Sequence, residues 1–378
     1  MIDKRQHWHL LDARAIWVKE FANALAKEVS LHAWQPDITW SGRLRRKVYT
    51  ETLQNPLLSI THFPLQRGFA RWPVRQWAGE AERMVKRLQS TQSNAVLLCS
   101  SPHYADVARL WQGPVVYYMS DLYYAWGDDP EYINAYDRLM CQHATLVCPV
   151  SSRGRDYLLE MAGCPDKKIV ISPMATRSEN LLPAAPGQPG PLPADLADLP
   201  RPIIGVIGNL ARNMDWIFLA NAVARLPSYS WAFVGPTDMP VAEADHRAAR
   251  QMLQQTGDRV RFVGYKPYGD LAAYARAVDI SFLPYRAVEP TYSGSSTRFY
   301  EHLAACRPML ATKGFAELLE KPPLVQLVET VEEFVDAIQQ LEKNGFSDGY
   351  EAVRWKNSQL ETWETRAQAM VKALSDRV

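Results

Sequence analysis

Short runs of consecutive apolar residues alternate along this chain with longer segments whose apolar residues recur at helical intervals. A continuous apolar run of four to six residues is typical of a strand buried on both faces of a parallel sheet. In the first half of the chain the pattern predicts strands at 8–11, 29–34, 95–100, 115–119, 144–149 and 169–172, and helices at 13–27, 71–87, 105–111, 132–142 and 152–162. This alternation predicts a first Rossmann-like α/β domain over residues 1–180.

A proline-rich segment separates this series from a second one. Seven prolines lie within residues 181–202, a composition typical of a semi-rigid, extended linker. Beyond it, strands are predicted at 203–207, 231–234, 260–263, 280–283 and 309–312, and helices at 216–224, 244–255, 269–277 and from 297 onward. We therefore expect a second Rossmann-like domain over 203–349, and a C-terminal helix over 350–378 that returns to pack on the first domain.

Length and composition agree with two globular domains. The chain has 378 residues, of which 47% are apolar and 22% charged, and this length exceeds what one typical core accommodates. The cysteines are odd in number and form no C-x-x-C pair, which predicts reduced core thiols instead of a disulfide framework or a zinc site. They are Cys99, Cys141, Cys148, Cys164 and Cys306.

Basic residues are concentrated near the N-terminus. Residues 1–110 hold 16 Lys and Arg against 9 Asp and Glu, whereas the remainder holds 26 against 32. Within 43–87 the basic residues alternate with tryptophans, which suits anionic lipid headgroups, although a solvated helix face explains the pattern equally well. No nucleic-acid-binding module accompanies the charge, so nucleic acid is not expected as a partner. Because no signal sequence or apolar run of about 18 residues is found, we expect a cytoplasmic protein, peripheral on the inner face of the cell membrane.

The turn after the first strand argues against a dinucleotide-binding enzyme. It reads Asp12-Ala-Arg14 and contains no G-x-G-x-x-G sequence. A Rossmann unit that binds a dinucleotide uses these glycines to bring its backbone close to the pyrophosphate. A dehydrogenase is therefore not expected.

Residues 292–312 are chemically the most distinctive part of the sequence. A Gly/Ser turn opens a helix, which Arg307-Pro308 ends. Free backbone N–H groups, hydroxyl groups and the positive end of a helix dipole, with Arg298 beside them, are the groups that bind a diphosphate. For such a turn in isolation, an ordinary serine-capped helix is the commoner explanation. The turn consists of Ser293, Gly294, Ser295, Ser296 and Thr297.

Three motifs in the second half, together with the two unequal α/β halves, resemble glycosyltransferases of the GT-B fold. They are Val-Gly-Tyr-Lys at 263–266, Phe-Leu-Pro-Tyr at 282–285 and Ser-Ser-Thr-Arg-Phe-Tyr-Glu-His-Leu-Ala-Ala at 295–305. The resemblance implies two parallel sheets that face each other across a cleft. The segments 118–121, Tyr-Met-Ser-Asp, and 295–298, Ser-Ser-Thr-Arg, are similar to motifs of the inverting xanthan glucuronosyltransferases. Glu301 stands where the large retaining group of GT-B nucleotide-sugar transferases also has a glutamate.

The resemblance implies roles for individual residues of the second domain. Ser295, Ser296 and Arg298 would hold the diphosphate of the donor. Glu301 would contact the ribose hydroxyls, with a solvated helix position as the alternative. The turn after strand 203–207 would form a second phosphate-facing segment, and two residues near 265 would border the base. These remaining donor-binding residues are Gly208, Asn209, Arg212, Tyr265 and Lys266.

The resemblance also assigns roles in the first domain. Asp121 follows a predicted strand, and α/β enzymes place their working groups at the carboxyl ends of parallel strands. Its implied role is that of general base for the acceptor hydroxyl, and a capping aspartate is the alternative. Tyr123, Tyr124 and Trp126 are expected to stack on sugar rings of the acceptor. His103 is a further candidate for acceptor binding, with a structural histidine as its alternative.

Departures from the family pattern bear on the mechanism. Retaining GT-B enzymes commonly have two glutamates eight positions apart, but Ser293 stands eight positions before Glu301, which favours inversion. Residues 173–175 read Pro-Met-Ala where Pro-Asn-Gly is usual, so the hinge turn differs. No Asp-x-Asp motif with apolar flanks is found, and a metal is therefore not expected.

The sequence thus predicts a transferase that moves a sugar from a nucleotide-sugar donor, UDP-linked, to a saccharide or lipid-linked saccharide acceptor in bacterial surface or exopolysaccharide synthesis. Three alternatives remain open at this point. They are a retaining GT-B transferase without a side-chain base, a GT-B nucleotide-sugar 2-epimerase, and a non-catalytic carbohydrate-binding relative.

Overall fold

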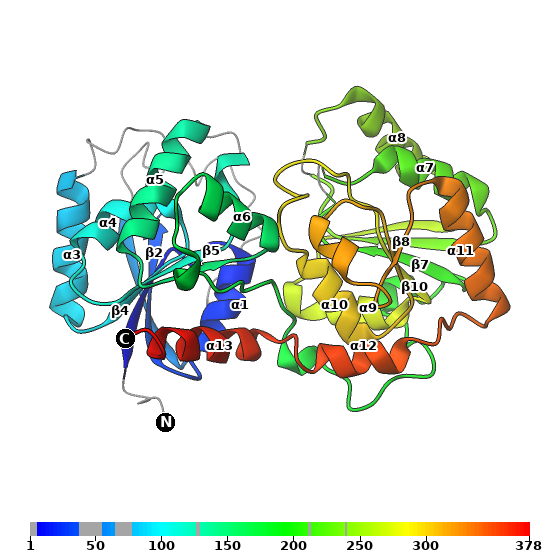
Figure 1. The fold of residues 1–378 in the computed structure, drawn as a ribbon. Coiled ribbons are helices and arrows are strands. Elements are labelled where there is room, and N and C mark those ends of the chain that lie inside the picture. The colour runs from blue at the N-terminus through cyan, green and yellow to red at the C-terminus, as the bar shows by residue number, and fades with distance from the viewer. Residues whose placement is uncertain (1–5, 38–54, 65–77, 126–128, 211–212, 239) are drawn as a thin grey trace. The chain divides into compact units, whose positions relative to one another are not determined.

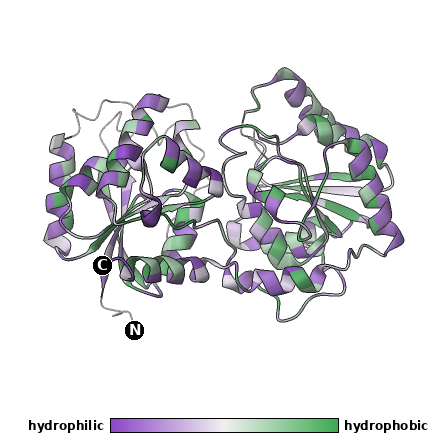
Figure 2. Cartoon of the chain, in the orientation of Figure 1, coloured by the Kyte–Doolittle hydropathy of each residue, from purple (hydrophilic) through white to green (hydrophobic). Residues whose placement is uncertain are grey.

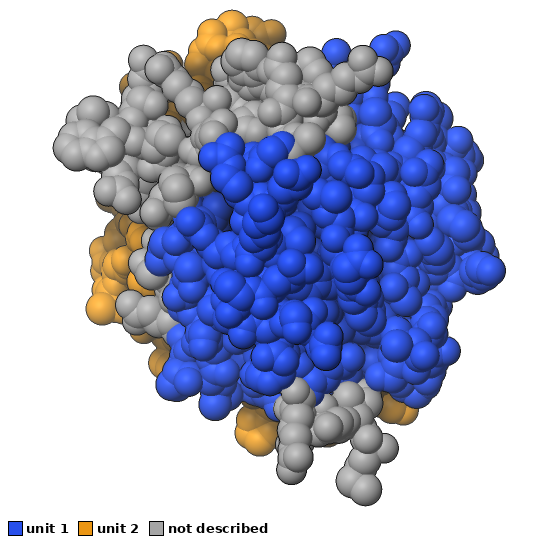
Figure 3. All heavy atoms as spheres, turned by 90° about the vertical axis from the view of Figure 1, so that its left-hand side faces the viewer, with its two compact units in different colours: residues 1–174, 363–378 blue, residues 175–362 orange. Residues whose placement is uncertain are grey.

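The computed structural model describes residues 6–37, 55–64, 78–125, 129–210, 213–238 and 240–378, and the chain divides into two compact units. Unit 1 comprises residues 1–174 and 363–378, and unit 2 comprises residues 175–362 (Figure 1; blue and orange in Figure 3). Each unit contains one six-stranded sheet in which neighbouring strands run parallel. The α/β fold class predicted from the apolar pattern is confirmed.

The sheet of unit 1 has the strand order β3-β2-β1-β4-β5-β6. Its central strands β4 and β5 are buried at every position, as expected for parallel strands with helices on both faces. The chain runs from β1 outward to β3 and then continues from β4 in the other direction, so the strand order reverses between β1 and β4. The strands are β1 (His7–Leu11), β2 (Ser30–Asp37), β3 (Leu58–Pro64), β4 (Val96–Cys99), β5 (Val115–Met119) and β6 (Leu146–Pro149). The helices are α1 (Ile16–Leu25), α3 (Ala78–Thr91), α4 (Ala105–Leu110), α5 (Pro130–His143), α6 (Ser152–Glu160) and α13 (Trp363–Ser375), with short 3-10 helices η2 (Pro102–Tyr104), η3 (Tyr123–Ala125) and η4 (Asp166–Lys168).

Adjacent residues of β5 show how the two faces of this sheet are covered. The hydroxyl group of Tyr117 donates to the carboxylate of Asp137 on α5 at 2.6 Å. The ring of Tyr118 lies 4.9 Å from the ring of Phe21 on α1, on the opposite face. Helix α13 packs against α1, so the end of the chain helps to cover this second face (Figure 1).

The sheet of unit 2 has the order β12-β11-β10-β7-β8-β9, which reverses between β7 and β10. Residues of α7, α8 and α11 pack with the strands on one face, and residues of α9 and of segment 192–199 pack on the other. The apolar residues of the chain are concentrated on the strands of both sheets (Figure 2). The strands are β7 (Ile203–Ile207), β8 (Ser230–Val234), β9 (Val260–Gly264), β10 (Ile280–Leu283), β11 (Met309–Ala311) and β12 (Gln326–Leu327). The helices are α7 (Trp216–Arg225), α8 (Ala244–Gln255), α9 (Leu271–Ala277), α10 (Thr297–Ala305), α11 (Val331–Lys343) and α12 (Glu351–Ser358), with η5 (Ser178–Asn180), η6 (Ala194–Leu196), η7 (Tyr268–Asp270) and η8 (Ala316–Glu320).

The segment 169–172, predicted as a strand, is not one. Within the described parts of the chain, its one ladder pairing is an isolated bridge between Ile169 and Val147. The backbone N–H of Ile169 is already bonded to Asp166 of the preceding 3-10 helix at 2.8 Å, and Pro173 follows the segment. Because of this bond and of Pro173, the segment pairs with β6 through one bridge and through the separate hydrogen bonds that the N–H groups of Val170 and Ser172 donate to it.

The predicted helix over 350–378 is divided in two, because the segment between the halves is used for a bridge. Thr362 pairs with Thr176, and the N–H of Thr176 donates to the carbonyl of Glu361 at 3.0 Å. Helix α12 consequently belongs to unit 2 and α13 to unit 1. The proline-rich segment 181–202 belongs to unit 2, where Leu196 and Leu199 are buried against its sheet.

All five cysteines are buried and free, as predicted for reduced core thiols. No helix within the described parts of the chain has the length and apolar content needed to cross a bilayer. Of the segment proposed to contact a membrane, residues 43–54 and 65–77 lie outside the described residues, and 78–87 form most of α3.

Candidate functional site

The residues predicted to bind the donor lie mainly at the carboxyl edge of the sheet in unit 2, around the point where its strand order reverses. Open parallel sheets bind ligands in the crevice that such a reversal creates. Gly208 follows β7 on one side of this point, and the loop after β10 leads on the other side to the N-terminus of α10. The turn after β7 and the start of α10, which are far apart in the sequence, therefore lie at the same edge of the sheet.

Two glycines allow the backbone to approach closely at this edge. Gly208 and Gly235 follow the adjacent strands β7 and β8 and adopt φ angles of 128° and 147°, which side chains strongly disfavour. A Cβ atom on Gly235 would lie 1.7 Å from the carbonyl oxygen of Gly208, and this backbone atom cannot move aside cheaply. Both positions therefore require glycine.

Arg298 extends from the first turn of α10 over the backbone of Gly208. A Cβ atom on Gly208 would lie 1.7 Å from the Nε atom of Arg298, so the guanidinium lies directly against this glycine. The Nε atom is buried and has no hydrogen-bond partner within the described residues. Burial, followed by the positive charge of Arg298, lowers the pKa of His302 to about 3. The site thus presents a partly desolvated cation beside a helix N-terminus.

The hydroxyl groups predicted to bind the diphosphate have partners within unit 2. Ser296 is the N-cap of α10, and its Oγ accepts the backbone N–H of Phe299 at 3.3 Å. The hydroxyl of Ser295 and the backbone N–H of Ser296 both donate to Glu317 at 2.9 Å. The hydroxyl of Ser293 donates to Glu289 at 2.6 Å. Two carboxylates of the chain itself therefore lie along the predicted diphosphate turn.

Two backbone donors at the same helix N-terminus remain open. An α-helix leaves its first N–H groups without intrahelical partners. In the described part of the chain, the N–H groups of Ser296 and Phe299 are bonded as above, whereas those of Thr297 and Arg298 have no hydrogen-bond acceptor. Gly294 stands just before them in the turn, with its N–H bonded to Pro290 at 3.1 Å.

Glu301 is a buried residue, so its alternative assignment as a solvated helix position is wrong. Its side chain is 6% exposed. One carboxylate oxygen accepts the amide of Asn180 at 3.1 Å, and the other accepts the hydroxyl of Tyr268. Asn180 lies in a segment for which no role in the site was predicted. A ribose contact from Glu301 remains a prediction, and it would share the carboxylate with these two partners.

The remaining predicted donor residues lie in three different settings. Asn209 is exposed beside Gly208, and Arg212 lies outside the described residues. Tyr265 is half-buried after β9. Lys266 forms an ion pair with Asp195 at 2.7 Å, and its Nζ atom lies 5.9 Å from the ring centre of Tyr274.

In unit 1, Asp121 follows β5 at the carboxyl edge of the sheet. Its Oδ1 atom accepts the backbone N–H of the next residue, Leu122, at 2.8 Å, whereas a capping aspartate accepts an N–H two or three residues further along. The residue is half-buried, and its predicted role as a base does not conflict with this local bond, because a carboxylate accepts several hydrogen bonds. The adjacent hydroxyl of Ser120 donates to the carbonyl of Ser100 at 3.1 Å and ties this loop to the end of β4.

The predicted acceptor residues lie on the same edge. The ring of His103 is 5.8 Å from that of Tyr123, and its Nδ1 atom is 2.7 Å from the hydroxyl of Ser101. Tyr123 donates to the carbonyl of Ser100 at 3.0 Å, so its hydroxyl is engaged in the loop. Tyr124 stacks on Tyr157 with ring centres 4.4 Å apart. Trp126 lies outside the described residues.

Sequence reasoning missed a second polar group at this edge, formed by the turn after β1. Asp12 has a left-handed φ of 70°, which is uncommon for a residue with a side chain. Its carboxylate accepts Nε of Arg14 at 2.6 Å and the hydroxyl of Tyr104 at 3.3 Å, and its carbonyl accepts the hydroxyl of Ser100 at 2.6 Å. The sequence pattern could have indicated this group, since Asp12 and Arg14 follow a predicted strand in the same way as Asp121.

Within the described ranges, no group of three or more His, Cys, Asp or Glu side chains is arranged to hold a metal ion.

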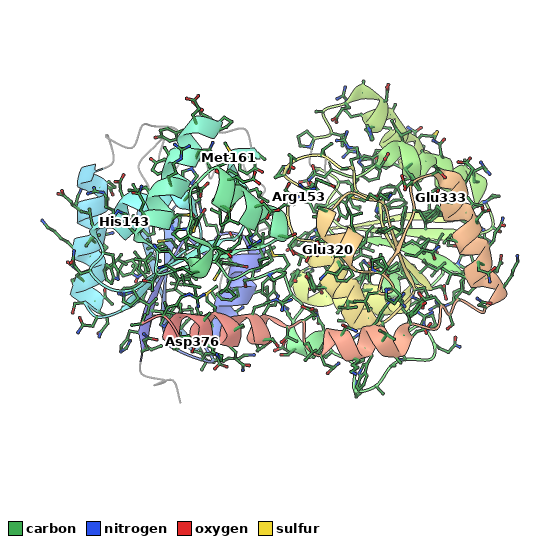
Figure 4. All side chains as sticks on the ribbon, viewed as in Figure 1. His143, Arg153, Met161, Glu320, Glu333 and Asp376 are labelled. Atoms are coloured by element: carbon green, nitrogen blue, oxygen red, sulfur yellow. The ribbon has the colours of Figure 1, made fainter. Side chains whose placement is uncertain are left out.

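Glu317 is the other residue of the site that was not predicted from the sequence. It lies on η8, three positions before Glu320, which is labelled in Figure 4.

No family model and no curated protein sequence matches this chain. Solved structures do match it over nearly its full length. A sucrose-phosphate synthase from Thermosynechococcus elongatus has a TM-score of 0.70 and 17% identity, with 98% of this chain and 99% of that one covered. Anabaena Alr3699/HepE in complex with UDP and glucose has a TM-score of 0.68 and 15% identity, with 98% and 99% covered. A putative UDP-N-acetylglucosamine 2-epimerase from Listeria monocytogenes has a TM-score of 0.62 and 11% identity, with 98% and 96% covered. The chain therefore has the GT-B fold of these proteins, as the sequence resemblance predicted.

Proposed function

We propose that this protein is a glycosyltransferase that moves a sugar from a UDP-linked donor to a saccharide or lipid-linked saccharide acceptor, with inversion at the anomeric carbon. The observation that carries the donor part is the position of Arg298. Its guanidinium lies against Gly208 at the strand-order reversal, beside the open N–H groups of Thr297 and Arg298 itself. A cation and a helix N-terminus together are suited to a diphosphate. HepE, a protein of the same fold, was solved with UDP and glucose bound.

In the proposed reaction an acceptor hydroxyl attacks the anomeric carbon of the donor. The bond between this carbon and the β-phosphate oxygen breaks, and UDP leaves with the electron pair. Asp121 accepts the proton of the attacking hydroxyl, as a general base positioned within hydrogen-bond reach would. Arg298 and the two open N–H groups stabilise the charge that develops on the departing diphosphate.

The finer assignments belong to the same proposal. The similarity of segments 118–121 and 295–298 to xanthan glucuronosyltransferase motifs supports an acceptor from bacterial surface or exopolysaccharide synthesis, at the cytoplasmic face of the membrane. We also propose that transfer needs no divalent metal, because cationic side chains and a helix N-terminus supply the positive charge. Transfer measured with and without a chelator tests this part, and loss of activity that Mg²⁺ or Mn²⁺ restores would refute it.

The donor site is tested by replacing Arg298. Arg298→Ala should weaken UDP binding roughly 10- to 100-fold, the range expected for loss of a charge-assisted hydrogen bond. Isothermal titration calorimetry with UDP measures the change. Arg225→Ala serves as the matched control, since Arg225 is an exposed arginine of the same unit, paired with Glu332 at 2.9 Å. Equal affinities in the Arg298 variant and the wild type would refute the assignment.

The base is tested by Asp121→Asn. We expect transfer to fall roughly 10²- to 10⁴-fold, because asparagine cannot take the proton, while UDP affinity is unchanged. Asparagine retains an acceptor for the N–H of Leu122, so the loop keeps its local bond. Asp129→Asn is the control, because the side chain of Asp129 likewise accepts a backbone N–H, that of Glu131 at 3.0 Å. Full transfer by the Asp121 variant would exclude this base and favour a retaining mechanism, which NMR of the product anomer distinguishes.

A putative UDP-N-acetylglucosamine 2-epimerase has the same fold, so glycosyl transfer must be distinguished from epimerisation at C2. Incubation with and without an acceptor distinguishes them. The protein incubated with a UDP-sugar alone should release no C2 epimer. Addition of acceptor should release UDP in proportion to the glycoside formed. A non-catalytic carbohydrate-binding protein would do neither, and its melting temperature would not rise with UDP.

A further inference from the structure

Glu317 places a carboxylate at the N-terminus of α10, where a diphosphate was predicted. The residue belongs to η8 and is 9% exposed. Its carboxylate accepts the hydroxyl of Ser295, the backbone N–H of Ser296 and the hydroxyl of Tyr300. One of the four donors that a helix N-terminus offers to an anion is thus already used by an anion of the same chain.

Among the described residues, one charged side chain and three hydrogen-bond donors act on this carboxylate. Lys321, which follows η8, is the charged group that acts on Glu317, and Tyr300 on α10 is the titratable group bonded to it. Burial raises the pKa of Glu317, and Lys321 and the hydrogen bonds oppose this rise. The carboxylate is therefore held in place by hydrogen bonds, and among the effects that oppose the rise the charge of Lys321 comes first.

The open N–H groups of Thr297 and Arg298 directly follow the bonded N–H of Ser296 along the chain. A phosphate oxygen bound to the N–H of Thr297 would stand within about two residue spacings of the Glu317 carboxylate. Like charges this close repel each other strongly where water is excluded. Glu317 therefore both shapes the turn and disfavours a second anion next to it.

We propose that Glu317 is a positioning residue of the donor site, which holds the Ser295–Ser296 turn through its hydrogen bonds and limits diphosphate affinity through its charge. This inference rests on the proposed function. It predicts that UDP binding favours the neutral form of Glu317, so that a proton is taken up from solvent when the diphosphate binds. Donor affinity then rises as the pH falls through the pKa of this residue.

The test compares UDP binding to the wild type and to Glu317→Gln by calorimetry between pH 5 and pH 8. At pH 8 the variant should bind UDP roughly three- to tenfold more tightly, because its neutral amide keeps an acceptor for Ser296 without the charge. As the pH falls through the pKa of Glu317, the two affinities should converge. The ratio at each pH cancels the titration of UDP itself, since both proteins bind the same ligand. Uridine, which has no phosphate, should bind both proteins equally.

Two further variants make the outcome decisive. Glu320→Gln changes an exposed glutamate of the same 3-10 helix and should leave UDP binding unchanged at every pH. Tyr300→Phe removes one donor to the carboxylate, which raises the pKa of Glu317 and should shift the midpoint of the wild-type profile to higher pH. This variant provides the test even where Glu317→Gln fails to fold.

A merely structural role predicts a different result, namely an affinity that falls in Glu317→Gln by the same factor at every pH. That result, or equal affinities at pH 8, overturns the inference while the proposed function stands. Absence of UDP binding by the wild type would overturn both.

Discussion

The serines at the start of α10 show how a correct local prediction can leave the chemistry incomplete. The helix begins where the Gly/Ser turn predicted, and Ser296 is its N-cap. The acids that engage the neighbouring hydroxyls are Glu289 and Glu317, and Glu317 lies more than twenty positions away from Ser295. Sequence spacing indicates which groups a turn can offer, but only the tertiary fold determines which of them are already bonded. Arg298 and Gly208 were both predicted to bind the donor, whereas the contact between them was not predicted.

A second residue-scale feature is the buried carboxylate of Asp137, which gives unit 1 a predicted pH dependence. Asp137 is 1% exposed and accepts the hydroxyls of Tyr117 and Tyr157 at 2.6 and 2.8 Å. Burial raises its pKa from 3.8 to about 6, although both hydrogen bonds oppose the rise. Between these two values the folded state binds more protons than the unfolded state, so the free energy of unfolding falls as the pH rises from 4 through 6.

Asp137→Asn should remove this dependence. The unfolding free energy of the variant relative to the wild type should increase by about 2–3 kcal/mol between pH 4 and pH 7, as a shift of this size implies. Urea denaturation of both proteins at several pH values, followed by circular dichroism, measures the difference. Parallel pH profiles for the two proteins would show that Asp137 does not titrate in this range.

At the scale of elements, the apolar pattern located most strands and helices because each is buried along its own length. Helix α8 was predicted with its observed bounds, and β5 likewise. The failures occurred where pairing depends on a distant segment. The run 169–172 is apolar but makes a single bridge, and β3 (Leu58–Pro64) lies in a region whose alternating residues showed no continuous apolar run. The seven prolines of 181–202 predicted a linker, and this composition does not reveal that Leu196 and Leu199 of the same segment are buried in unit 2.

At the scale of the whole molecule, the chain crosses between its two units twice, once near residue 174 and once near residue 362. The second crossing brings α13 back to unit 1, a return that the sequence predicted without the break before it. The candidate donor residues and the candidate base were assigned to different halves of the chain, and they lie in different units. Each unit is built so that its candidate residues follow parallel strands near a reversal of strand order.

Helix α13 is expected to stabilise unit 1 and not unit 2, and this expectation can be tested for each unit separately. Helix α13 packs against α1, and its buried apolar residues include Leu374, which is 1% exposed. Leu374→Ala should lower the unfolding free energy of unit 1 by about 2–4 kcal/mol, the usual cost of a large-to-small change in a core. Leu360→Ala, at a position 64% exposed in the segment between α12 and α13, should change it by less than about 0.5 kcal/mol.

Hydrogen exchange detected by mass spectrometry locates the effect. In Leu374→Ala, protection should decrease in α1 and in the strands of unit 1, whereas β7, β8 and α10 should exchange as in the wild type. UDP affinity should then also be retained, because every described residue proposed to hold the diphosphate belongs to unit 2. An equal loss of protection in both units would mean that they unfold as one cooperative body, and the donor site would then depend on a helix that lies outside its own unit.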